Sequence, residues 1–286
     1  MENGSASSPA PFDTPLSLAA PLPPAPLNFI GRKLLRLAET IHGLGAFALI
    51  TLGVTLTKFN VAAKVIHPLV RVHIHRAGVR LLPIISFLSC ALGFAVIGQT
   101  VALLNRVGAR GFTGTIMVTV VVRELGPIIT ALLVLARVGT ATVIELGTAR
   151  AMGEVEALEA LGIDPIHYLV VPRVIGLALS IFSLTVYLIL ITLFSGYLFA
   201  FLQDVPLPPG DYLSQLAAAM RWDDFVLLTL KTVLFGAIIA TVSCYEGLAK
   251  PLRLEEVSAA TTRAVVQCIE LVVLLDALFI LFLLLV

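Results

Sequence analysis

Four charged residues lie inside apolar stretches that are long enough to cross a membrane: Arg123, Glu124, Lys231 and Asp276. Charge at membrane depth is expensive unless the groups pair with one another or face a polar cavity. A cation in a low dielectric attracts a phosphate strongly, and nearby carboxylates would neutralise that cation when no phosphate is bound. The four residues are therefore candidates for a site that binds a polar headgroup. The alternative, fixed ion pairs that only hold the helices together, stays open at this point.

Three further charges, Arg137, Glu145 and Glu246, are expected near the inner boundary of the membrane. There the favoured interpretation is a structural ion pair, or a long side chain that reaches toward the headgroups. His73 and His75 do not form a metal-binding pattern, because alternate positions on a helix face different directions and no third ligand is nearby. No catalytic residue and no metal ligand is therefore expected.

The sequence holds no pattern for nucleotide hydrolysis. The phosphate-binding motif G-x-x-x-x-G-K-[ST] is absent, and neither a nucleophile elbow nor an H-E-x-x-H helix occurs. No cofactor is therefore expected on this chain. Any energy source must be an ion gradient through the buried charges, or a separate ATPase that docks on an inner helix.

The composition is that of a membrane protein. Hydrophobic residues make up 58% of the 286-residue chain and charged residues 13%, with a mean hydropathy of +1.02. Several apolar runs exceed the roughly 20 residues that cross a bilayer as a helix. The net charge of +1 comes with no basic tract, so nothing suggests binding to nucleic acid. The expected fold class is an all-α polytopic membrane protein.

The chain divides into a tail and a membrane domain. Residues 1–28, rich in Pro, Ala and Ser, are expected to form a disordered tail, and residues 29–286 a single membrane domain. Residues 29–59 are expected as an elbow helix in the membrane interface, with a sixth span as the alternative. Five spans follow, over residues 81–104, 116–149, 174–202, 225–248 and 264–286. The second would run for ~50 Å, longer than the ~30 Å hydrocarbon core, so a bend is expected at Gly126–Pro127.

Lys and Arg are distributed unevenly between the two sides of the expected bundle. They concentrate in residues 58–80 and in the other connections on that side, whereas the connection over residues 203–224 is mostly acidic. Because positive residues collect in cytoplasmic loops, the N-terminus is expected in the cytoplasm and the C-terminus on the external side of the membrane.

A short acidic helix is expected between the second and third spans, over residues 150–164. Val155, Leu158 and Leu161 recur at three-residue spacing and should share one face, while Glu156 and Glu159 point to another side. A helix held rigidly between two membrane spans offers a surface that another protein can push.

The run from Arg123 to Arg173 resembles the MlaE/YrbE family of ABC-transporter permeases. The matching motifs are R-E-L-G-P, A-x-R-x-G-[ST]-A, an acidic helix ending in D-P, and V-x-P-R, followed by A-T-T-R at residues 260–263. The resemblance extends from about Phe29 to the C-terminus. It departs from the family pattern at Gly153 and Glu154, where a Glu-Gln pair is usual, and at Ser258, where Gly is common.

This resemblance implies a permease subunit that moves phospholipids, or related lipids, between the inner membrane of a Gram-negative bacterium and a periplasmic MCE-domain protein. It implies a homodimer with two ATPase subunits that carry ATP and Mg, and in some cases a STAS-domain protein. The acidic helix would be the cytoplasmic coupling helix, with ATPase contacts at Glu154, Val155, Glu156, Leu158, Glu159 and Leu161.

Two other function classes compete with a lipid permease. An ion-coupled secondary carrier for a hydrophobic or amphipathic substrate would use Arg123, Glu124 and Asp276 as a relay. Such carriers commonly contain paired broken helices, and this sequence shows only one candidate, at Pro127. A non-transporting scaffold would not need charge at membrane depth. The lipid permease is therefore favoured.

Overall fold

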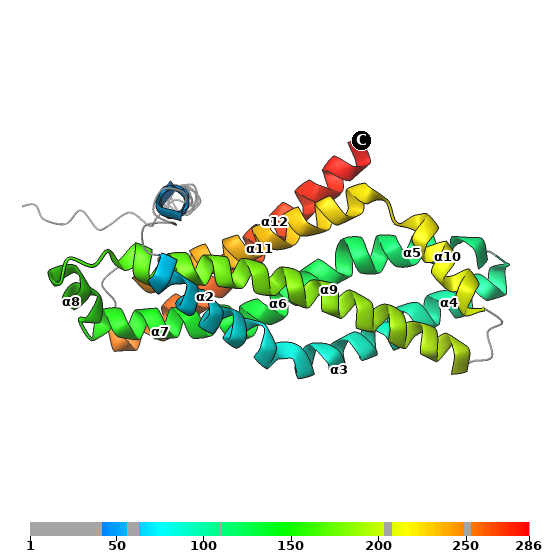
Figure 1. Ribbon diagram of the computed structural model, residues 1–286, viewed down its shortest axis with the longest axis horizontal. Helices are drawn as coiled ribbons and strands as arrows, with labels where there is room; N and C mark the ends of the chain where they lie inside the picture. The colour runs from blue at the N-terminus through cyan, green and yellow to red at the C-terminus, as the bar shows by residue number, and fades with distance from the viewer. Residues whose placement is uncertain (1–41, 56–62, 109, 203–207, 249–252, 286) are drawn as a thin grey trace, which may run out of the picture. The chain divides into compact units, whose positions relative to one another are not determined.

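The computed structural model describes residues 42–55, 63–108, 110–202, 208–248 and 253–285, and these residues form helices without any strand (Figure 1). Residues 44–286 make up one compact unit, separate from residues 1–43. The expected tail at residues 1–28 lies outside the described residues, as does the first part of the expected elbow. Of that elbow the structure describes one shorter apolar helix, His42–Thr55.

Five helices are long and apolar enough to cross a membrane: Ile66–Val101, Gly114–Ala151, Ile166–Leu202, Trp222–Leu248 and Leu254–Leu285. The expectation of an all-α protein with five spans is therefore confirmed.

The first and last spans begin earlier than expected. Helix α2 (Ala63–Ala77) continues through the turn Val79–Leu81 into α3 (Leu82–Leu92), so the basic segment placed beside the membrane is part of the first span. The positive charges of residues 58–80 indicated a connection, although the apolar residues between these charges are compatible with a helix. Similarly, the last span starts with a 3-10 turn at Leu254–Glu256 and α12 (Val257–Leu285).

The second span contains two π-helical turns. Its elements are α5 (Thr113–Met117), a π turn at Val118–Leu125, α6 (Gly126–Val134), a second π turn at Leu135–Gly139, and α7 (Thr140–Ala151). The Gly126–Pro127 step, the expected bend, lies where the first π turn ends. Proline has no N–H for the carbonyl four residues earlier and its ring crowds that carbonyl, so a regular α-helix cannot continue there. π turns often occur at functional sites, and these two hold Arg123, Glu124 and Arg137.

The helix α8 (Glu154–Ala160) joins the second and third spans. Gly153 and Gly162 flank it with φ angles of 78° and 76°, which favour glycine because they are left-handed. The next span begins with a π turn at Ile166–Val170, where the Asp164 carboxylate accepts a hydrogen bond of 3.0 Å from the Ile166 N–H. The position of α8 is thus fixed by specific backbone geometry at both ends.

Helix α9 (Val171–Leu202) packs against α2, α3 and α11 (Trp222–Leu248), and α11 packs in turn against α7 and α12 (Figure 1). Ile181, Leu184, Phe235 and Ile239 are buried where these helices meet. Small residues allow close approach, since a Cβ on Gly236 would meet the backbone of Ala178. This packing fixes α11, which carries the central residue of the candidate site.

The connection between the third and fourth spans contains a helix that the sequence did not indicate, α10 (Pro209–Ala219). Proline is common in turns, but Pro209 occupies the first helical position, where a missing N–H costs nothing. Tyr212 of α10 is buried, and its hydroxyl donates a hydrogen bond of 3.1 Å to the Leu193 carbonyl. Burial raises the pKa of Tyr212 to about 12, so the hydroxyl keeps its proton.

Candidate functional site

Lys231 is the centre of the candidate site. It lies on α11 and is 4% exposed. Its ammonium donates hydrogen bonds of 2.9 Å to Glu124 Oε2 and of 2.9 Å to the Arg123 carbonyl, and it lies 2.5 Å from Asp276 Oδ1 in an ion pair. An ammonium has three donors, so Lys231 is fully satisfied. Three spans, the second, fourth and fifth, are tied together at this one atom.

The Arg123 carbonyl can accept a hydrogen bond from Lys231 because of the proline in the second span. Pro127 has no N–H, and the carbonyl it would serve in an α-helix is that of Arg123. Lys231 donates to this same carbonyl. A backbone carbonyl that receives no N–H from the residue four positions later can accept a hydrogen bond from another donor. The R-E-L-G-P motif therefore provides the cluster with a backbone oxygen as well as with two charged side chains.

Arg123 has a partner of its own, Asp224, which the sequence had assigned to the outer loop. The distance from Arg123 Nε to Asp224 Oδ1 is 2.8 Å, and the Asp224 side chain is 3% exposed. Asp224 Oδ2 also accepts a hydrogen bond of 2.8 Å from the Arg221 N–H. A carboxylate in the first turn of a helix is expected to interact with the free N–H groups at the helix start, as Asp224 does with the Arg221 N–H. The ion pair with Arg123 was not predictable in this way, because it depends on how two spans pack.

The structure thus brings together all four predicted residues and adds Asp224. The two cations face three carboxylates, so the fully ionised cluster carries one net negative charge. The pocket beside it has a volume of about 20 Å³, room for a single water, and its remaining lining is apolar, from Leu227, Leu228, Phe279 and Leu283. The side chains of Arg123 and Glu124 are 28% and 25% exposed, so they form the accessible edge of the cluster.

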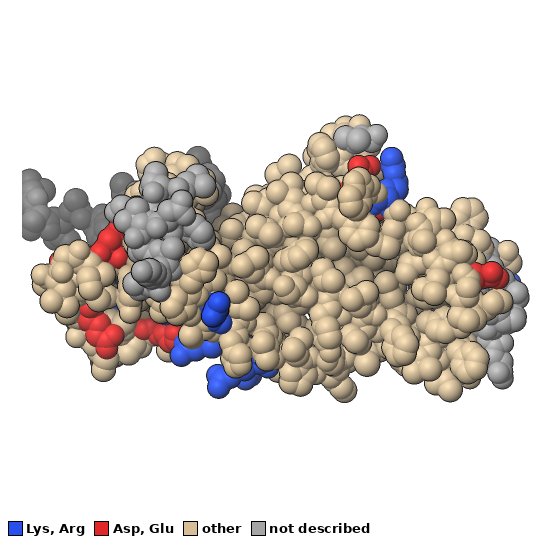
Figure 2. Space-filling view, viewed as in Figure 1, with Lys and Arg blue, Asp and Glu red and all other residues tan. Residues whose placement is uncertain are grey.

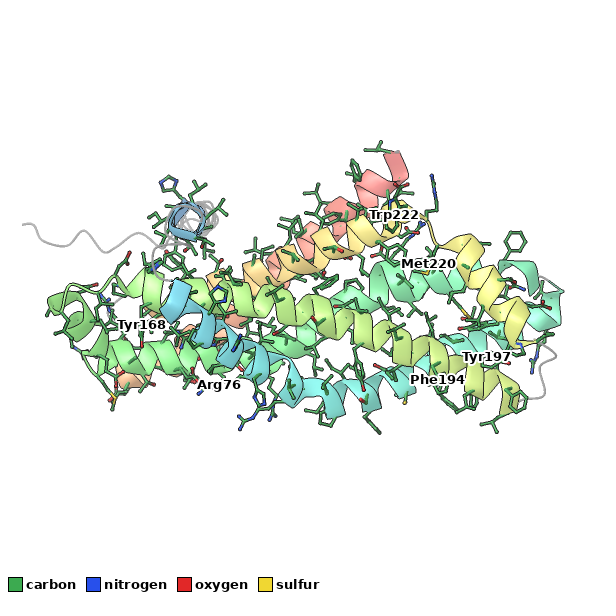
Figure 3. The ribbon with its side chains drawn as sticks, in the orientation of Figure 1. Arg76, Tyr168, Phe194, Tyr197, Met220 and Trp222 are labelled. Carbon is green, nitrogen blue, oxygen red and sulfur yellow. The ribbon has the colours of Figure 1, made fainter. Side chains whose placement is uncertain are left out.

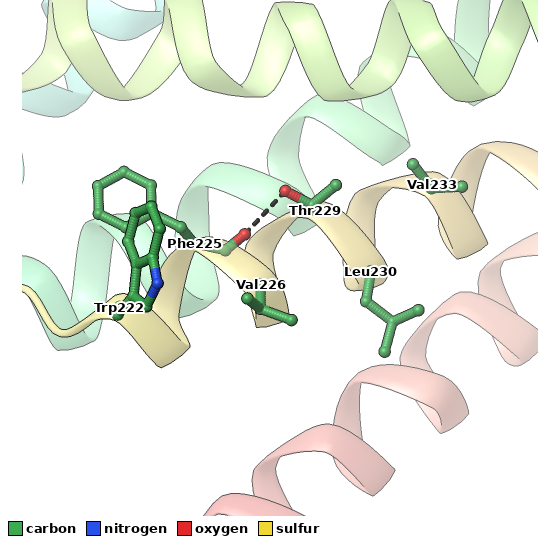
Figure 4. Close-up of a pocket in the computed structure, with 6 residues that line it drawn as sticks. All are labelled: Trp222, Phe225, Val226, Thr229, Leu230 and Val233. Atoms are coloured by element: carbon green, nitrogen blue, oxygen red, sulfur yellow. Dashed lines mark hydrogen bonds between the residues drawn. The ribbon is translucent and has the colours of Figure 1, made fainter.

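A larger apolar groove runs along the other side of α11 (Figure 4). It has a volume of about 480 Å³ and is lined by Trp222, Phe225, Val226, Thr229, Leu230 and Val233. Its one hydroxyl, on Thr229, donates to the Phe225 carbonyl at 2.7 Å and is therefore already bonded. At 100° per residue these positions face away from Lys231. The groove offers hydrocarbon contact without any polar group from the cluster.

Glu145 and Glu246, which were expected near the inner boundary, are paired, as the favoured interpretation predicted. Glu145 accepts hydrogen bonds from Arg76 at 3.0 Å and from Arg173 at 3.4 Å. Glu246 accepts one of 3.2 Å from Arg263 and one of 3.3 Å from the Gln267 amide. These pairs connect α2, α7 and α9 on one side and α11 and α12 on the other. Arg137 is different, because it has no ion pair within the described part of the chain.

The predicted apolar face of α8 is not one face in the structure. Val155 is 1% exposed and packs with Leu146, Val170 and Leu248 of its own chain, so its side chain is not on the exposed surface of α8. Leu158 is partly buried, whereas Leu161 is 75% exposed. The three-residue spacing identified Val155, Leu158 and Leu161 as apolar positions, but it could not show that Val155 packs against the rest of the chain.

The acidic side chains of α8 face outward. Glu154, Glu156 and Glu159 are exposed, and Glu156 Oε1 lies 3.2 Å from Arg150 Nε. Among the described residues, no three His, Cys, Asp or Glu side chains come together in a way that would hold a metal ion.

Comparison with known proteins shows which family has this arrangement. The family model described as Permease MlaE matches residues 70–282. A probable ABC transporter permease protein of Rickettsia prowazekii is 28% identical over 240 residues, which cover 84% of this chain and 90% of that protein. The intermembrane phospholipid transport system permease protein MlaE of Haemophilus influenzae is 26% identical over 251 residues, covering 87% and 95%. The chloroplastic protein TRIGALACTOSYLDIACYLGLYCEROL 1 of Arabidopsis thaliana is 32% identical over 196 residues, covering 68% and 55%. With five membrane-spanning helices, the chain belongs to the MlaE family of ABC transporter permeases.

Proposed function

We propose that this protein is the membrane subunit of an ATP-driven transporter that moves phospholipids between the inner membrane and a periplasmic MCE-domain protein. The observation that carries the proposal is the Lys231 cluster, a set of ionised groups held at membrane depth in an otherwise apolar bundle. The Haemophilus influenzae relative is named for phospholipid transport, which supports the substrate class.

The cluster supplies what a phospholipid headgroup needs. In the empty state Glu124 and Asp276 neutralise Lys231, and Asp224 neutralises Arg123. A headgroup phosphate competes with these carboxylates for the two cations, most easily at the exposed edge formed by Arg123 and Glu124. Since the adjoining pocket holds only about 20 Å³, loading requires the second, fourth and fifth spans to separate.

One chain presents this edge outward and cannot enclose a lipid with it. A two-fold homodimer places two such edges around a shared cavity. The acyl chains then lie against apolar helix surfaces, while the phosphate meets the charged edge.

ATP hydrolysis takes place on two separate ATPase subunits that bind ATP and Mg. They contact the cytoplasmic side of α8 through Leu158, Leu161 and the outward carboxylates Glu154, Glu156 and Glu159. Val155 is excluded from this contact because it packs α8 against the bundle. This packing lets α8 transmit a movement of the ATPase subunits to the membrane helices. This orientation places the N-terminus in the cytoplasm and the C-terminus in the periplasm. A STAS-domain protein accompanies the ATPase.

The proposal is tested with proteoliposomes that contain this chain and its ATPase, and with a soluble MCE-domain protein as acceptor. Transfer of a fluorescent phospholipid should require hydrolysable ATP and should survive a proton ionophore. The surplus carboxylate of the cluster favours one other function, proton-coupled carriage, because a proton can occupy it. Transfer that continues without ATP but stops with the ionophore would establish that carrier and refute the proposal.

A further inference from the structure

A second polar pocket lies at the end of the bundle that carries α8. It has a volume of about 710 Å³ and lies between the first and second spans. Its lining residues are His73, Arg76, Arg80, Ile84, Leu133, Ala136, Arg137, Val138, Ala141, Thr142 and Glu145. Figure 2 shows Lys and Arg atoms gathered over α2 and α7 at this end, and Figure 3 shows Arg76 there. This pocket is far larger than the space beside Lys231.

Positive charge exceeds negative charge in this pocket. Arg76, Arg80 and Arg137 line it, with Glu145 as the only carboxylate among the lining residues. That carboxylate is already shared between Arg76 and Arg173. Arg80 and Arg137 are exposed, and neither has an ion pair within the described ranges. Two guanidinium groups therefore lack an anion in a pocket whose lining also includes apolar side chains.

Part of the pocket lining is apolar. Ile84, Leu133 and Val138 lie beside the guanidinium groups, on the first and second spans. An unpaired charge next to hydrocarbon costs free energy, so an anion that can enter the pocket would stabilise these two arginines. A guanidinium binds phosphate with two parallel hydrogen bonds, which makes phosphate the best-matched anion. A molecule with a phosphate and an attached hydrocarbon chain would contact both the guanidinium groups and the apolar side chains of this pocket.

We propose that this pocket binds the phosphate of an anionic phospholipid from the leaflet on the α8 side, through Arg80 and Arg137, with an acyl chain along Ile84, Leu133 and Val138. The site is separate from the Lys231 cluster, because Glu124 and Arg137 are ~20 Å apart along their helix. It does not depend on the proposed transport, since a lipid held here can be a permanent structural partner. Free phosphate offers the same chemistry without the chain.

Native mass spectrometry of the full-length protein, purified in detergent and delipidated, tests this proposal. Dioleoyl phosphatidylglycerol and dioleoyl phosphatidylcholine are titrated separately. The Arg80→Gln/Arg137→Gln variant should bind phosphatidylglycerol about tenfold more weakly than wild type, with little change for phosphatidylcholine. The matched control is Arg106→Gln, since Arg106 is also exposed but lies in α4 (Gln99–Val107), outside this pocket.

Competition with inorganic phosphate identifies the source of the anion. If millimolar phosphate leaves phosphatidylglycerol bound to wild type, the hydrocarbon wall contributes and the occupant is a lipid. If phosphate displaces it, the site is a phosphate site that free anion can fill, which also supports the arginine assignment. Wild-type affinity for phosphatidylglycerol in the double variant overturns the proposal.

Folding of the double variant is checked by size exclusion and melting temperature. If it does not fold, Arg137→Gln alone is used, because that side chain has no ion pair to lose within the described residues, and a loss of about threefold is expected. ATP-driven lipid transfer is measured separately, so a failure of this inference leaves the proposed transport function standing.

Discussion

Replacement of Lys231 by methionine separates the structural contribution of the cluster from its contribution to transport. The change keeps the length of the side chain and removes the ammonium that three acceptors share. Removing one partner of a buried ion pair costs ~3–5 kcal/mol, because the other charge stays buried without compensation. The lower end applies here, because the Glu124 side chain is 25% exposed and can be hydrated. A loss of ~3 kcal/mol corresponds to a fall of ~6–12 °C in melting temperature.

The double variant Lys231→Met/Asp276→Leu should recover more than half of that loss. It removes the carboxylate that would otherwise be buried and unpaired, and replacing a buried pair by apolar residues is often neutral or stabilising. Melting temperature of the purified complex measures stability, and transfer of fluorescent phospholipid measures function. If the cluster binds the headgroup, transfer should stay at least tenfold below wild type although stability returns. Wild-type transfer by the stable double variant would show that the cluster is only structural.

Glu124→Gln keeps the size of the side chain and removes one charge, so the complex should assemble while transfer falls about tenfold; normal assembly with normal transfer would exclude Glu124 from the site. Leu161→Arg should prevent the ATPase from copurifying, because Leu161 is 75% exposed and is a proposed ATPase contact. Val155→Ala should retain the ATPase but lower the free energy of unfolding by ~1–3 kcal/mol, because it leaves a cavity. Because burial raises the pKa of Tyr212 from 10.0 to about 12, its stabilising contribution should be constant below pH 10 and decrease as the pH approaches 12. Tyr212→Phe should remove that alkaline decrease, as followed by melting temperature against pH.

The features that the sequence predicted are those set by single segments. Five spans follow from the length and hydropathy of apolar runs, and the structure has five such helices. Glu145 and Glu246 were expected to be paired near the inner boundary, and both are. Arg123 and Glu124 stood out because charge is rare at membrane depth. These inferences needed no knowledge of how the helices pack.

The features that the sequence did not predict depend on contacts between segments. Asp224 was assigned to a loop because it stands among other acidic residues, and its partner Arg123 is about a hundred residues away in the chain. Val155 was given to a partner protein because an apolar stripe on a short helix can face either way, and here it faces inward. The helix α10 was missed because proline marks turns and helix starts equally well. For Asp224 and Val155 the deciding interaction is tertiary, whereas for the start of α10 the ambiguity is local.

The hydrogen bond from Lys231 to the Arg123 carbonyl has a consequence for mutagenesis of this cluster. A side chain can be deleted by substitution, but a backbone oxygen cannot. Arg123→Ala would remove the guanidinium that pairs with Asp224 and leave the acceptor for Lys231 in place. Only Pro127→Ala reaches that acceptor, by restoring the N–H that an α-helix would direct to it. Alanine scanning of the charged side chains alone will therefore underestimate how firmly Lys231 is attached to the second span.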